Sequence, residues 1–174
     1  ITGVSGGAHG SVSINGTTHN IEYSPVSNFN GVDTISYTIS DGSASTVQTL
    51  TITVASVNDA PVLLDKSISI NEDGTSLIDV LQGATDVDGD TLTISAPGSS
   101  SNASISIEDG KIRYNPNANY NGTDTFTYTV TDNHGASVTK TATVVVNPVN
   151  DAPLANLTSA TTTEDTTAII DVLT

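Results

Sequence analysis

The sequence predicts an all-β fold, built as tandem β-sandwiches with about seven strands in each complete repeat. Apolar and polar residues alternate with a period of two along most of the chain, and the strand formers Thr, Val, Ile and Tyr dominate these segments. Asn, Asp and Gly mark the turns between them. The chain also repeats itself, because the Val-Asn-Asp-Ala-Pro sequence at 57–61 recurs 92 residues later at 149–153. A constant period of this size predicts an array of small domains.

The same offset of 92 residues fixes the domain boundaries. Glu-Asp at 72–73 recurs at 164–165, and Asp-Val-Leu at 79–81 recurs at 171–173. We therefore expect one complete repeat at 58–149. Residues 1–57 are expected to form the C-terminal part of a repeat, and residues 150–174 the first two strands of a third.

Seven short strands are expected in the complete repeat. The first three lie near 66–70, 75–80 and 91–95. A hairpin follows, in which Glu108-Asp109-Gly110 separates two alternating segments that end at Ile107 and begin at Ile112. The last two strands are 125–131 and about 137–146. Their predicted core-facing residues are Phe126, Tyr128, Val130, Ala142, Val144 and Val146.

The earlier copy contains counterparts of only part of this pattern. Strand 35–39 matches 125–131, Asn15-Gly16 marks a turn, and Leu50, Ile52 and Val54 match the inward residues of the last strand. Ile1 aligns near Ile94, so counterparts of the first two strands do not occur in 1–57. One interpretation is a window of a longer repetitive chain. The other is head-to-tail self-assembly, in which 150–174 of one copy donates strands to 1–57 of another.

The composition excludes several classes of function. Nineteen acidic residues against 4 basic ones give a net charge of −15, which argues against nucleic acid and anionic membranes as partners. The acids either keep a surface protein soluble or bind cations. Because there is no Cys, disulfides, thiolate metal sites and thiol nucleophiles are excluded, and calcium is a plausible substitute for covalent cross-links.

Membrane insertion and catalysis are not expected. No apolar run approaches the roughly 20 residues that a spanning helix needs, and any targeting signal is expected to lie outside this sequence. His9, His19 and His134 are scattered, and no Ser/His/Asp arrangement recurs with the repeat. We therefore expect that the chain is not an enzyme.

The strongest chemical motif is Asp86-Val87-Asp88-Gly89-Asp90. Three carboxylates at alternate positions, with a glycine that permits a tight bend, can converge on one hard cation. The motif is similar to the start of an EF-hand loop, but Pro97 occupies the position of the bidentate glutamate and a strand follows. An EF-hand is therefore rejected. The alternative is a solvated turn between strands.

Strand directions predict where other acids meet this loop. Asp132 ends the long strand 125–131 beside the loop, whereas Asp124 starts that strand at the opposite end, which faces the next repeat. At the first junction we expect Asp33, Asn58 and Asp59 to meet Asp86, Asp88 and Asp132, with Asp90 joining them. Each like-charged pair at ~5 Å costs roughly 3 kcal/mol at an effective dielectric constant near 20. A Ca²⁺ ion, which takes 6–8 oxygen ligands, would remove that cost.

Several motifs together resemble the cadherin-like tandem repeats of giant bacterial RTX-type surface adhesins. They are the Val-Asn-Asp-Ala-Pro linkers, the Asp-x-Asp loop about 28 residues further on, Gly-x-Asp-Thr-Phe-x-Tyr at 122–128, and the Thr-Asp-x-x-Gly or Ser-Asp-Gly turns at 131–135 and 40–42. The resemblance covers essentially the whole chain. It implies an Ig-like/cadherin-like sandwich with Greek-key connections, rigidified by calcium and used as an extracellular spacer.

The resemblance also implies a ligand set. The positions that match cadherin calcium ligands are the linker residues Asn58, Asp59, Asn150 and Asp151, the Asp-x-Asp pair Asp86 and Asp88, Asp132 after the long strand, Asp33 and Asp124 before it, and Glu72 in the first strand. Glu72 would serve the lower junction with Asn150 and Asp151. Because the linker is short and has Ser56 or Pro148 where cadherins have an acid, one or two ions per junction are expected.

The expected function is a structural extender module of a large adhesin or surface filament. The alternative is a carbohydrate-binding β-sandwich module that uses an outward threonine-rich face. That face would contain Thr125, Thr127, Thr129, Thr131, Thr139, Thr141 and Thr143. Outward threonines also follow from strand propensity and solubility alone. Few aromatic residues are available to stack on a sugar, since Phe126 and Tyr128 are predicted to point inward.

Overall fold

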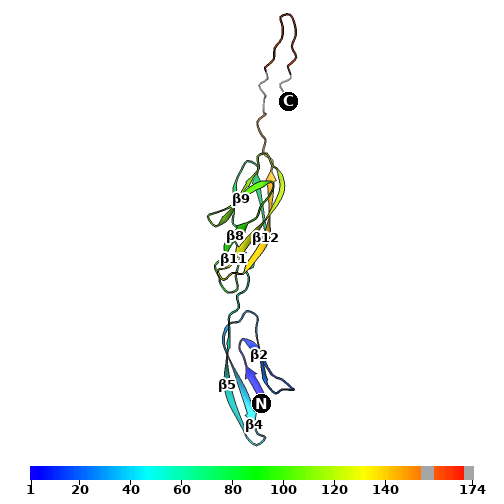
Figure 1. Cartoon of the computed structure of the whole chain (residues 1–174). Coiled ribbons are helices and arrows are strands. Elements are labelled where there is room, and N and C mark those ends of the chain that lie inside the picture. Colours follow the sequence, from blue (N-terminus) through cyan, green and yellow to red (C-terminus); the bar gives the residue numbers. More distant parts are fainter. Residues whose placement is uncertain (154–158, 171–174) are drawn as a thin grey trace.

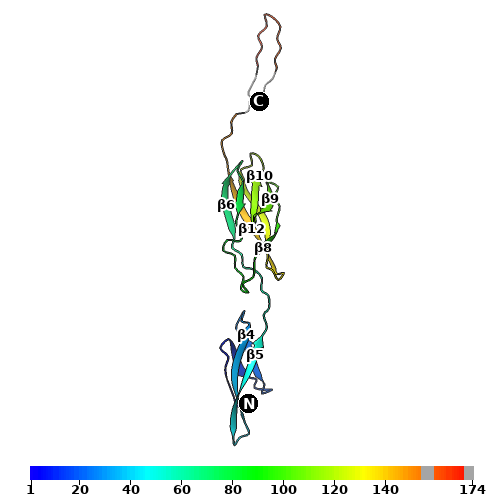
Figure 2. The same cartoon turned by 90° about the vertical axis from the view of Figure 1, so that its left-hand side faces the viewer.

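The computed structural model describes residues 1–153 and 159–170, and its regular secondary structure is entirely β. Two views at right angles show two separate groups of strands joined by a linker (Figure 1, Figure 2). We call the group formed by strands β1 to β5 unit 1, and the group formed by strands β6 to β12 unit 2. Within the described residues there is no helix that could cross a membrane.

Unit 2 is a two-sheet sandwich of seven strands, as the sequence predicts. The strands are β6 (Lys66–Asn71), β7 (Ser76–Ile78), β8 (Thr93–Pro97), β9 (Ala103–Glu108), β10 (Lys111–Pro116), β11 (Gly122–Thr131) and β12 (Ser137–Asn147). One sheet has the order β6-β12-β11-β8 and the other the order β7-β10-β9. The predicted hairpin turn joins β9 to β10. Asp109 and Gly110 both have positive φ there (51° and 71°), as a two-residue hairpin loop requires.

The core of unit 2 lies between its two sheets. The predicted inward residues of β11 and β12 are all buried, and Phe126, Tyr128 and Val130 expose no more than 2% of their surface. From the facing sheet, Ile112 and Tyr114 are fully buried, and the ring of Tyr114 stacks against Phe126 with centroids 5.9 Å apart. Alternation with period two therefore predicted the buried face correctly.

Unit 1 contains the counterparts of β8 to β12. Its strands are β1 (Gly3–Gly6), β2 (Gly10–Ile14), β3 (Ile21–Pro25), β4 (Gly31–Ser40) and β5 (Ser45–Val54), in sheets ordered β1-β4-β5 and β2-β3. Its core is only partly covered. Ile35 is buried, but Leu50, predicted to face inward, is 42% exposed, and Ile52 and Val54 are half-buried. The reason is that no strand of the described structure occupies the positions that β6 and β7 have in unit 2.

The predicted strands of the third repeat fall partly outside the described residues, since 154–158 and 171–174 are not described. The described part, 150–153 and 159–170, contains no strand. The strands expected in 150–174 would pair with the remaining strands of a third sandwich. The prediction for 150–174 therefore stays a prediction.

Each unit contains a buried aspartate that receives hydrogen bonds from a tyrosine hydroxyl. In unit 2, Asp124 accepts from the hydroxyls of Tyr114 and Ser100, both at 2.6 Å, from Asn102 Nδ2 at 3.3 Å and from its neighbouring amide at Thr125. Burial by itself would raise the pKa of Asp124, but these hydrogen bonds outweigh it and lower the pKa. The carboxylate thus stays charged inside the sandwich.

Asp33 is the counterpart in unit 1. It accepts from the hydroxyl of Tyr23 at 2.8 Å and from the amides of Ala8 and His9, each at 3.0 Å, as well as from Thr34. Burial opposes the charge, but the bonds from Tyr23 and the amides outweigh it and lower the pKa of Asp33 to about 2. Burial and the bond to Asp33 together raise the pKa of Tyr23 to about 12.

Replacing Tyr114 with phenylalanine is expected to destabilise unit 2 by about 1.5–3 kcal/mol. The substitution removes a short hydrogen bond to a buried carboxylate without changing the shape of the ring. Chemical denaturation measures the change. Tyr120→Phe is the control, because the hydroxyl of Tyr120 donates to the backbone carbonyl of Thr123 and not to a buried carboxylate. Equal losses in the two variants would contradict the role given to Asp124.

The stability of both units should fall in acid. A carboxyl group whose pKa is lower in the folded state than in the unfolded state stabilises the folded state. This contribution is complete when the pH is above the unfolded-state pKa of about 3.9, and it disappears as the pH falls through the folded-state pKa. For Asp33 the loss should extend from about pH 4 down to about pH 2. Melting temperatures between pH 7 and pH 2 in a chelator test this. In Asp33→Asn the acid-dependent part of the unit 1 transition should shrink, and an unchanged profile would contradict the assignment.

Candidate metal centre

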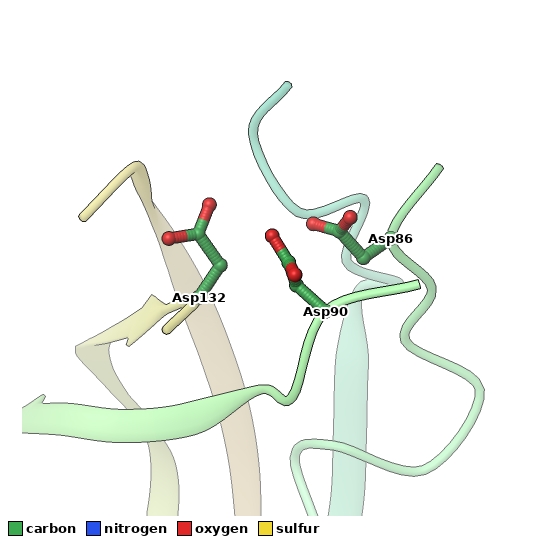
Figure 3. A group of neighbouring side chains, drawn as sticks. All are labelled: Asp86, Asp90 and Asp132. Atoms are coloured by element: carbon green, nitrogen blue, oxygen red, sulfur yellow. The ribbon is translucent and has the colours of Figure 1, made fainter. Parts of the chain in front are cut away.

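Three carboxylates converge at the end of unit 2 that faces the linker. Asp86 and Asp90 lie in the loop between β7 and β8, and Asp132 directly follows β11. Each offers an oxygen, and these oxygens all lie within 4.8 Å of one another. Figure 3 shows the carboxylate of Asp90 between those of Asp86 and Asp132. We call these three residues the acidic cluster. The strand directions predicted this meeting of Asp132 with the loop.

The loop is bent by its own hydrogen bonds. The amide of Asp88 donates to Asp86 Oδ1 at 2.9 Å, and the amide of Gly89 donates to the carbonyl of Asp86 at 3.3 Å. Gly89 has a φ of 81°, which a glycine adopts without strain. One oxygen of Asp86 is therefore used to shape the turn. The other, Oδ2, is buried and has no hydrogen-bond partner among residues 1–153 and 159–170.

Asp132 is held rigidly. It exposes 4% of its surface, and its Oδ1 accepts the amides of His134, Gly135 and Ala136 at 2.8, 2.5 and 2.9 Å. Its Oδ2 accepts Asn58 Nδ2 at 2.8 Å. Burial would raise the pKa of Asp132, but the hydrogen bonds from Asn58 and the three amides outweigh it and lower the pKa. The cluster therefore contains at least one firmly ionised carboxylate.

Asp90 is paired with a histidine that the sequence interpretation did not assign to the site. The Oδ2 of Asp90 lies 2.7 Å from His134 Nδ1, and the Asp90 side chain is only 9% exposed. The hydrogen bond to Asp90 and the charge of Asp90 raise the pKa of His134. The available signal was that the turn after β11 is one residue longer than its counterpart after Asp41. A length difference alone did not show that the extra turn would bring His134 to Asp90.

The linker is attached to this end of unit 2 at two points. Besides the bond from Asn58 to Asp132, the amide of Asp59 donates to Asp88 Oδ2 at 2.8 Å. A hollow of about 420 Å³ lies beside these contacts. It is lined by Asn30, Ser56, Asn58, Asp88, Asp90 and His134. Residues of unit 1, the linker and unit 2 thus border one polar space.

Asp33 and Asp124 differ from the expectation that they face a junction as ligands. The structure does not bring either one into the acidic cluster. Both carboxylates are turned into their own sandwich, where a tyrosine hydroxyl and backbone amides donate to them. Their role in the described structure is to hold the core and neighbouring loops together.

At the other end of unit 2, Glu72 is buried and its Oε1 accepts the amide of Val149 at 2.7 Å, while Asn121 donates to Oε2 at 3.3 Å. Asn150 and Asp151 are exposed, and Asn150 Nδ2 donates to the carbonyl of Asp151. Glu72 therefore fixes the exit of the chain from β12. Within the described residues the structure does not gather Glu72, Asn150 and Asp151 into an acidic group.

The donor set of the acidic cluster fits a hard divalent cation. All its ligand atoms are carboxylate oxygens, and one oxygen of Asp86, Oδ2, is buried without a hydrogen-bond partner among the described residues. Oxygen-only sites of this kind suit Ca²⁺ or Mg²⁺ better than softer metals. A cation would supply to Asp86 Oδ2 the positive charge that no hydrogen-bond donor of the described residues supplies.

The outward threonine face predicted from the sequence is present on β11 and β12. Thr125, Thr127 and Thr129 lie opposite Thr143, Thr141 and Thr139. The hydroxyls of Thr129 and Thr139 are 2.8 Å apart and bond to each other. The rings of Phe126 and Tyr128, which could stack on a sugar, are buried in the core.

Comparison with solved structures supports the fold. Mouse protocadherin-24 EC1-3 is similar with a TM-score of 0.52 and 21% identity over 83% of this chain and 54% of that one. Human mucin-like protocadherin EC1-2 has a TM-score of 0.43 and 23% identity over 84% of both chains. An endo-fucoidan hydrolase of glycoside hydrolase family 107 has a TM-score of 0.40 and 20% identity over 85% of this chain.

The similarity to mouse protocadherin-24 concerns the fold alone, because the identity is 21%, and the two similarities with TM-scores below 0.5 carry no argument. The chain spans about half the length of the mouse protocadherin fragment (54%) and about a quarter of the hydrolase (24%). No curated protein matches the sequence. Domains with Ig-like and cadherin-like folds are typically not enzymes, and they are typically found outside the cell.

The sequence itself matches a family model, the bacterial Ig domain, over residues 1–54 and again over 58–146. The two matched segments are separated only by residues 55–57. Together they cover most of the chain. The chain belongs to the bacterial Ig domain family.

Proposed function

We propose that this chain is an extender module of a large extracellular adhesin or surface filament of the RTX type, and that calcium rigidifies the junctions between its repeats. The observation that carries the proposal is the buried Oδ2 of Asp86, which has no hydrogen-bond donor among the described residues and belongs to a carboxylate grouped with those of Asp90 and Asp132. Buried polar atoms are nearly always paired. A carboxylate oxygen without a partner therefore points to a cation.

Electrostatics supports the same conclusion. At the separation of these oxygens, within 4.8 Å, each pair of charges repels by roughly 3 kcal/mol at an effective dielectric constant near 20. The hydrogen bonds that lower the pKa of Asp132 prevent that group from relieving the repulsion by taking up a proton. Calcium, which takes 6–8 oxygen ligands, would replace repulsion with attraction.

Rigidity would follow from the way the linker is attached. Asn58 donates to Asp132, which belongs to the acidic cluster, and Asp59 donates to Asp88, which lies between two members of the cluster. An ion that fixes the loop and Asp132 relative to each other would fix both attachment points of the linker at once. Asn58 and Asp59 also offer oxygens that could complete the coordination.

The repeated sequence extends the proposal to the next junction. Asn150 and Asp151 occupy the positions of Asn58 and Asp59, and Glu72 holds the adjacent backbone at Val149. We propose that Glu72, Asn150 and Asp151 serve there when a third repeat is folded. A row of such units would hold a distal binding domain away from the cell surface or build a filament.

Sugar binding by the threonine face is the alternative function, and glycan binding that survives a chelator would favour it.

Calcium should lengthen and straighten the chain in solution. Small-angle scattering should give a larger maximum dimension in calcium than in EDTA. In the double variant Asp86→Asn with Asp88→Asn, the EDTA profile should persist in calcium. The variant Asp73→Asn with Asp109→Asn removes the same charge at exposed turns and should respond like the unmodified chain. Identical profiles with and without calcium would contradict the junction model.

The single variant Asp86→Asn should change stability in opposite directions with and without calcium. In EDTA it should melt higher than the unmodified chain, because it removes repulsion inside the cluster. At a calcium concentration 100 times the Kd, binding stabilises the unmodified chain by about 2.7 kcal/mol. This raises the melting temperature of unit 2 by roughly 10–20 °C, a gain that the variant should lose. Calorimetric melting curves measure both effects.

Asp109→Asn is the matched control, because it removes one charge from the exposed β9–β10 turn of the same unit. Its melting curve should shift with calcium as that of the unmodified chain does. If Asp86→Asn were less stable in EDTA, or if it kept the calcium shift, the acidic cluster would not be the calcium site.

A further inference from the structure

Four strands of unit 2 lie at the edges of its two sheets, and three of them have features that discourage pairing with a further strand. β7 is three residues long, β8 has a bulge opposite β11 and ends at Pro97, and β6 begins with Lys66. Short strands, bulges, prolines and lysines are the usual protection of a sheet edge. The fourth edge strand, β9, has none of these features.

β9 is a regular strand of six residues. In the described part of the chain it pairs only with β10, and it does so in one continuous register. It contains no lysine and no proline. Its one charged residue, Glu108, ends the strand and forms an ion pair with Arg113 at 2.6 Å. The outer edge of β9 is therefore open to a further strand.

The outer edge of β9 presents free backbone groups. Bonded pairs alternate along an antiparallel ladder. The amide of Asn117 donates to the carbonyl of Asn102 at 2.8 Å, so every second residue from Asn102 onward is bonded to the β10 side. The N–H and C=O groups of the residues between them point to the outer edge. These residues are Ala103, Ile105 and Ile107.

An apolar side chain is also exposed at this edge. Ala103, Ile105 and Ile107 alternate with outward serines and lie on the core side of β9. Ile107 is nevertheless 42% exposed, although Ile112, which lies opposite it on β10, is fully buried. A strand added to β9 would cover Ile107 from the side that β10 does not cover.

The same edge recurs in unit 1. The sequence Ser-Ile-Ser-Ile at 104–107 has its counterpart 93 residues earlier, in Ser-Val-Ser-Ile at 11–14 of β2. The amide of Asn15 donates to the carbonyl of Asn20 at 2.8 Å, so the backbone groups of Val12 and Ile14 point away from β3. Because β9 is an edge strand in the complete sandwich of unit 2, the edge position of β2 is a property of the repeat.

The charge distribution favours a second copy of this chain as the occupant. With a net charge of −15, two copies repel each other over most of their surface. Residues 91–107, which contain β8 and all of β9 except its last residue, have no Asp, Glu, Lys or Arg, and neither do residues 3–21, which contain β1 and β2. Two copies can meet at these edges without bringing like charges together.

We propose that β9 of one copy pairs in an antiparallel manner with β9 of a second copy, so that two three-stranded sheets become one sheet of six strands. Residues directly opposite each other must point to the same face of the sheet. The register that uses all the free groups places Ile105 opposite Ile105 of the second copy. Because both copies use the same surface, the contact closes as a dimer.

This register also agrees with the side chains. The remaining opposite pairs are Ala103 with Ile107, Ser104 with Ser106, and Asn102 with Glu108. The exposed Ile107 is thus covered by the second copy. The two Glu108 carboxylates lie at opposite ends of the paired strands, so no like charges face each other.

Cysteine pairing tests the register, because the chain has no cysteine of its own. Ser104→Cys and Ser106→Cys are made in separate proteins and mixed under mild oxidation. Opposite residues lie within the Cα distance that a disulfide spans, so a disulfide between 104 and 106 is expected, identified by peptide mass mapping. Ser104→Cys oxidised alone should give little product, because its two copies are diagonal neighbours about 7–8 Å apart. Thr141→Cys, on the outward face of β12, measures disulfides formed by random collision.

Proline tests the free amides, since an edge strand tolerates proline where the missing N–H points outward. Ile14→Pro with Ile107→Pro removes an outward amide from β2 and from β9. Ile14→Ala with Ile107→Ala is the matched control, because it removes the same side chains but keeps the amides. Each pair of edges loses two hydrogen bonds in the proline variant, so its dimer Kd should be about 10–100-fold higher than that of the control. Sedimentation over a range of concentrations measures the Kd, and circular dichroism shows whether both variants are folded.

Both experiments are run in EDTA and in calcium, because the pairing of β9 does not involve the acidic cluster. Dimers in both conditions, together with a 104–106 disulfide in excess of the Thr141→Cys background, support the proposal whatever calcium does to the junction. A chain that is monomeric at all concentrations in both conditions would overturn it. An equal Kd for the folded proline and alanine variants would overturn pairing through this edge, and a 106–106 disulfide as the main product would overturn the register.

Discussion

The repulsion among three carboxylates whose oxygens lie within 4.8 Å of one another is the physical constraint at the end of unit 2 that faces the linker. Asp86 is fixed by the turn that it forms with Asp88, and Asp132 by three backbone amides and Asn58. These hydrogen bonds keep the charges close to one another. The linker is bonded to Asp132, a member of the cluster, and to Asp88 in the loop that holds the other two members.

Inaccessible aspartate oxygens occur in two different environments in this chain, one rich in hydrogen-bond donors and one without a donor. Asp33 and Asp124 are each surrounded by donors, and the interior of the unit supplies all the compensation that the charge needs. Asp86 is only partly buried, but its Oδ2 is inaccessible and has no donor among the described residues. A fold that supplies donors to its buried aspartates and leaves this one oxygen without a donor is consistent with an ion that binds there.

The fold followed from sequence because its signals are local and repeated. Alternation placed Phe126, Tyr128 and Val130 in the core, and Asp109-Gly110 placed a hairpin turn. The meeting of Asp132 with the loop at 86–90 followed from strand direction. Burial in unit 1 did not follow, because the exposure of Leu50 depends on strands that are not paired with β5 in the described structure.

The site was less predictable, because its details depend on long-range donors. From sequence alone, the aspartate at the start of the long strand is predicted to be a metal ligand. In the structure its carboxylate instead accepts a hydrogen bond from a tyrosine hydroxyl, that of Tyr23 in unit 1 and that of Tyr114 in unit 2. The contact of His134 with Asp90 joins residues 44 positions apart, and nothing in the local sequence of either residue indicates it. Sequence motifs thus located the acidic cluster. Which acids belong to the core and which to the site could be decided only from the packing in the structure.

The most direct measurement is a crystal structure of the chain grown in calcium, with anomalous scattering used to locate the metal. We expect an anomalous peak for a Ca²⁺ ion that binds Asp86 Oδ2, Asp90 and Asp132. Oxygen atoms from residues 58–59 or 88 should complete its coordination. A map in which the three carboxylates are well ordered, but in which only a water molecule or no peak lies between them, would contradict a calcium site at the acidic cluster.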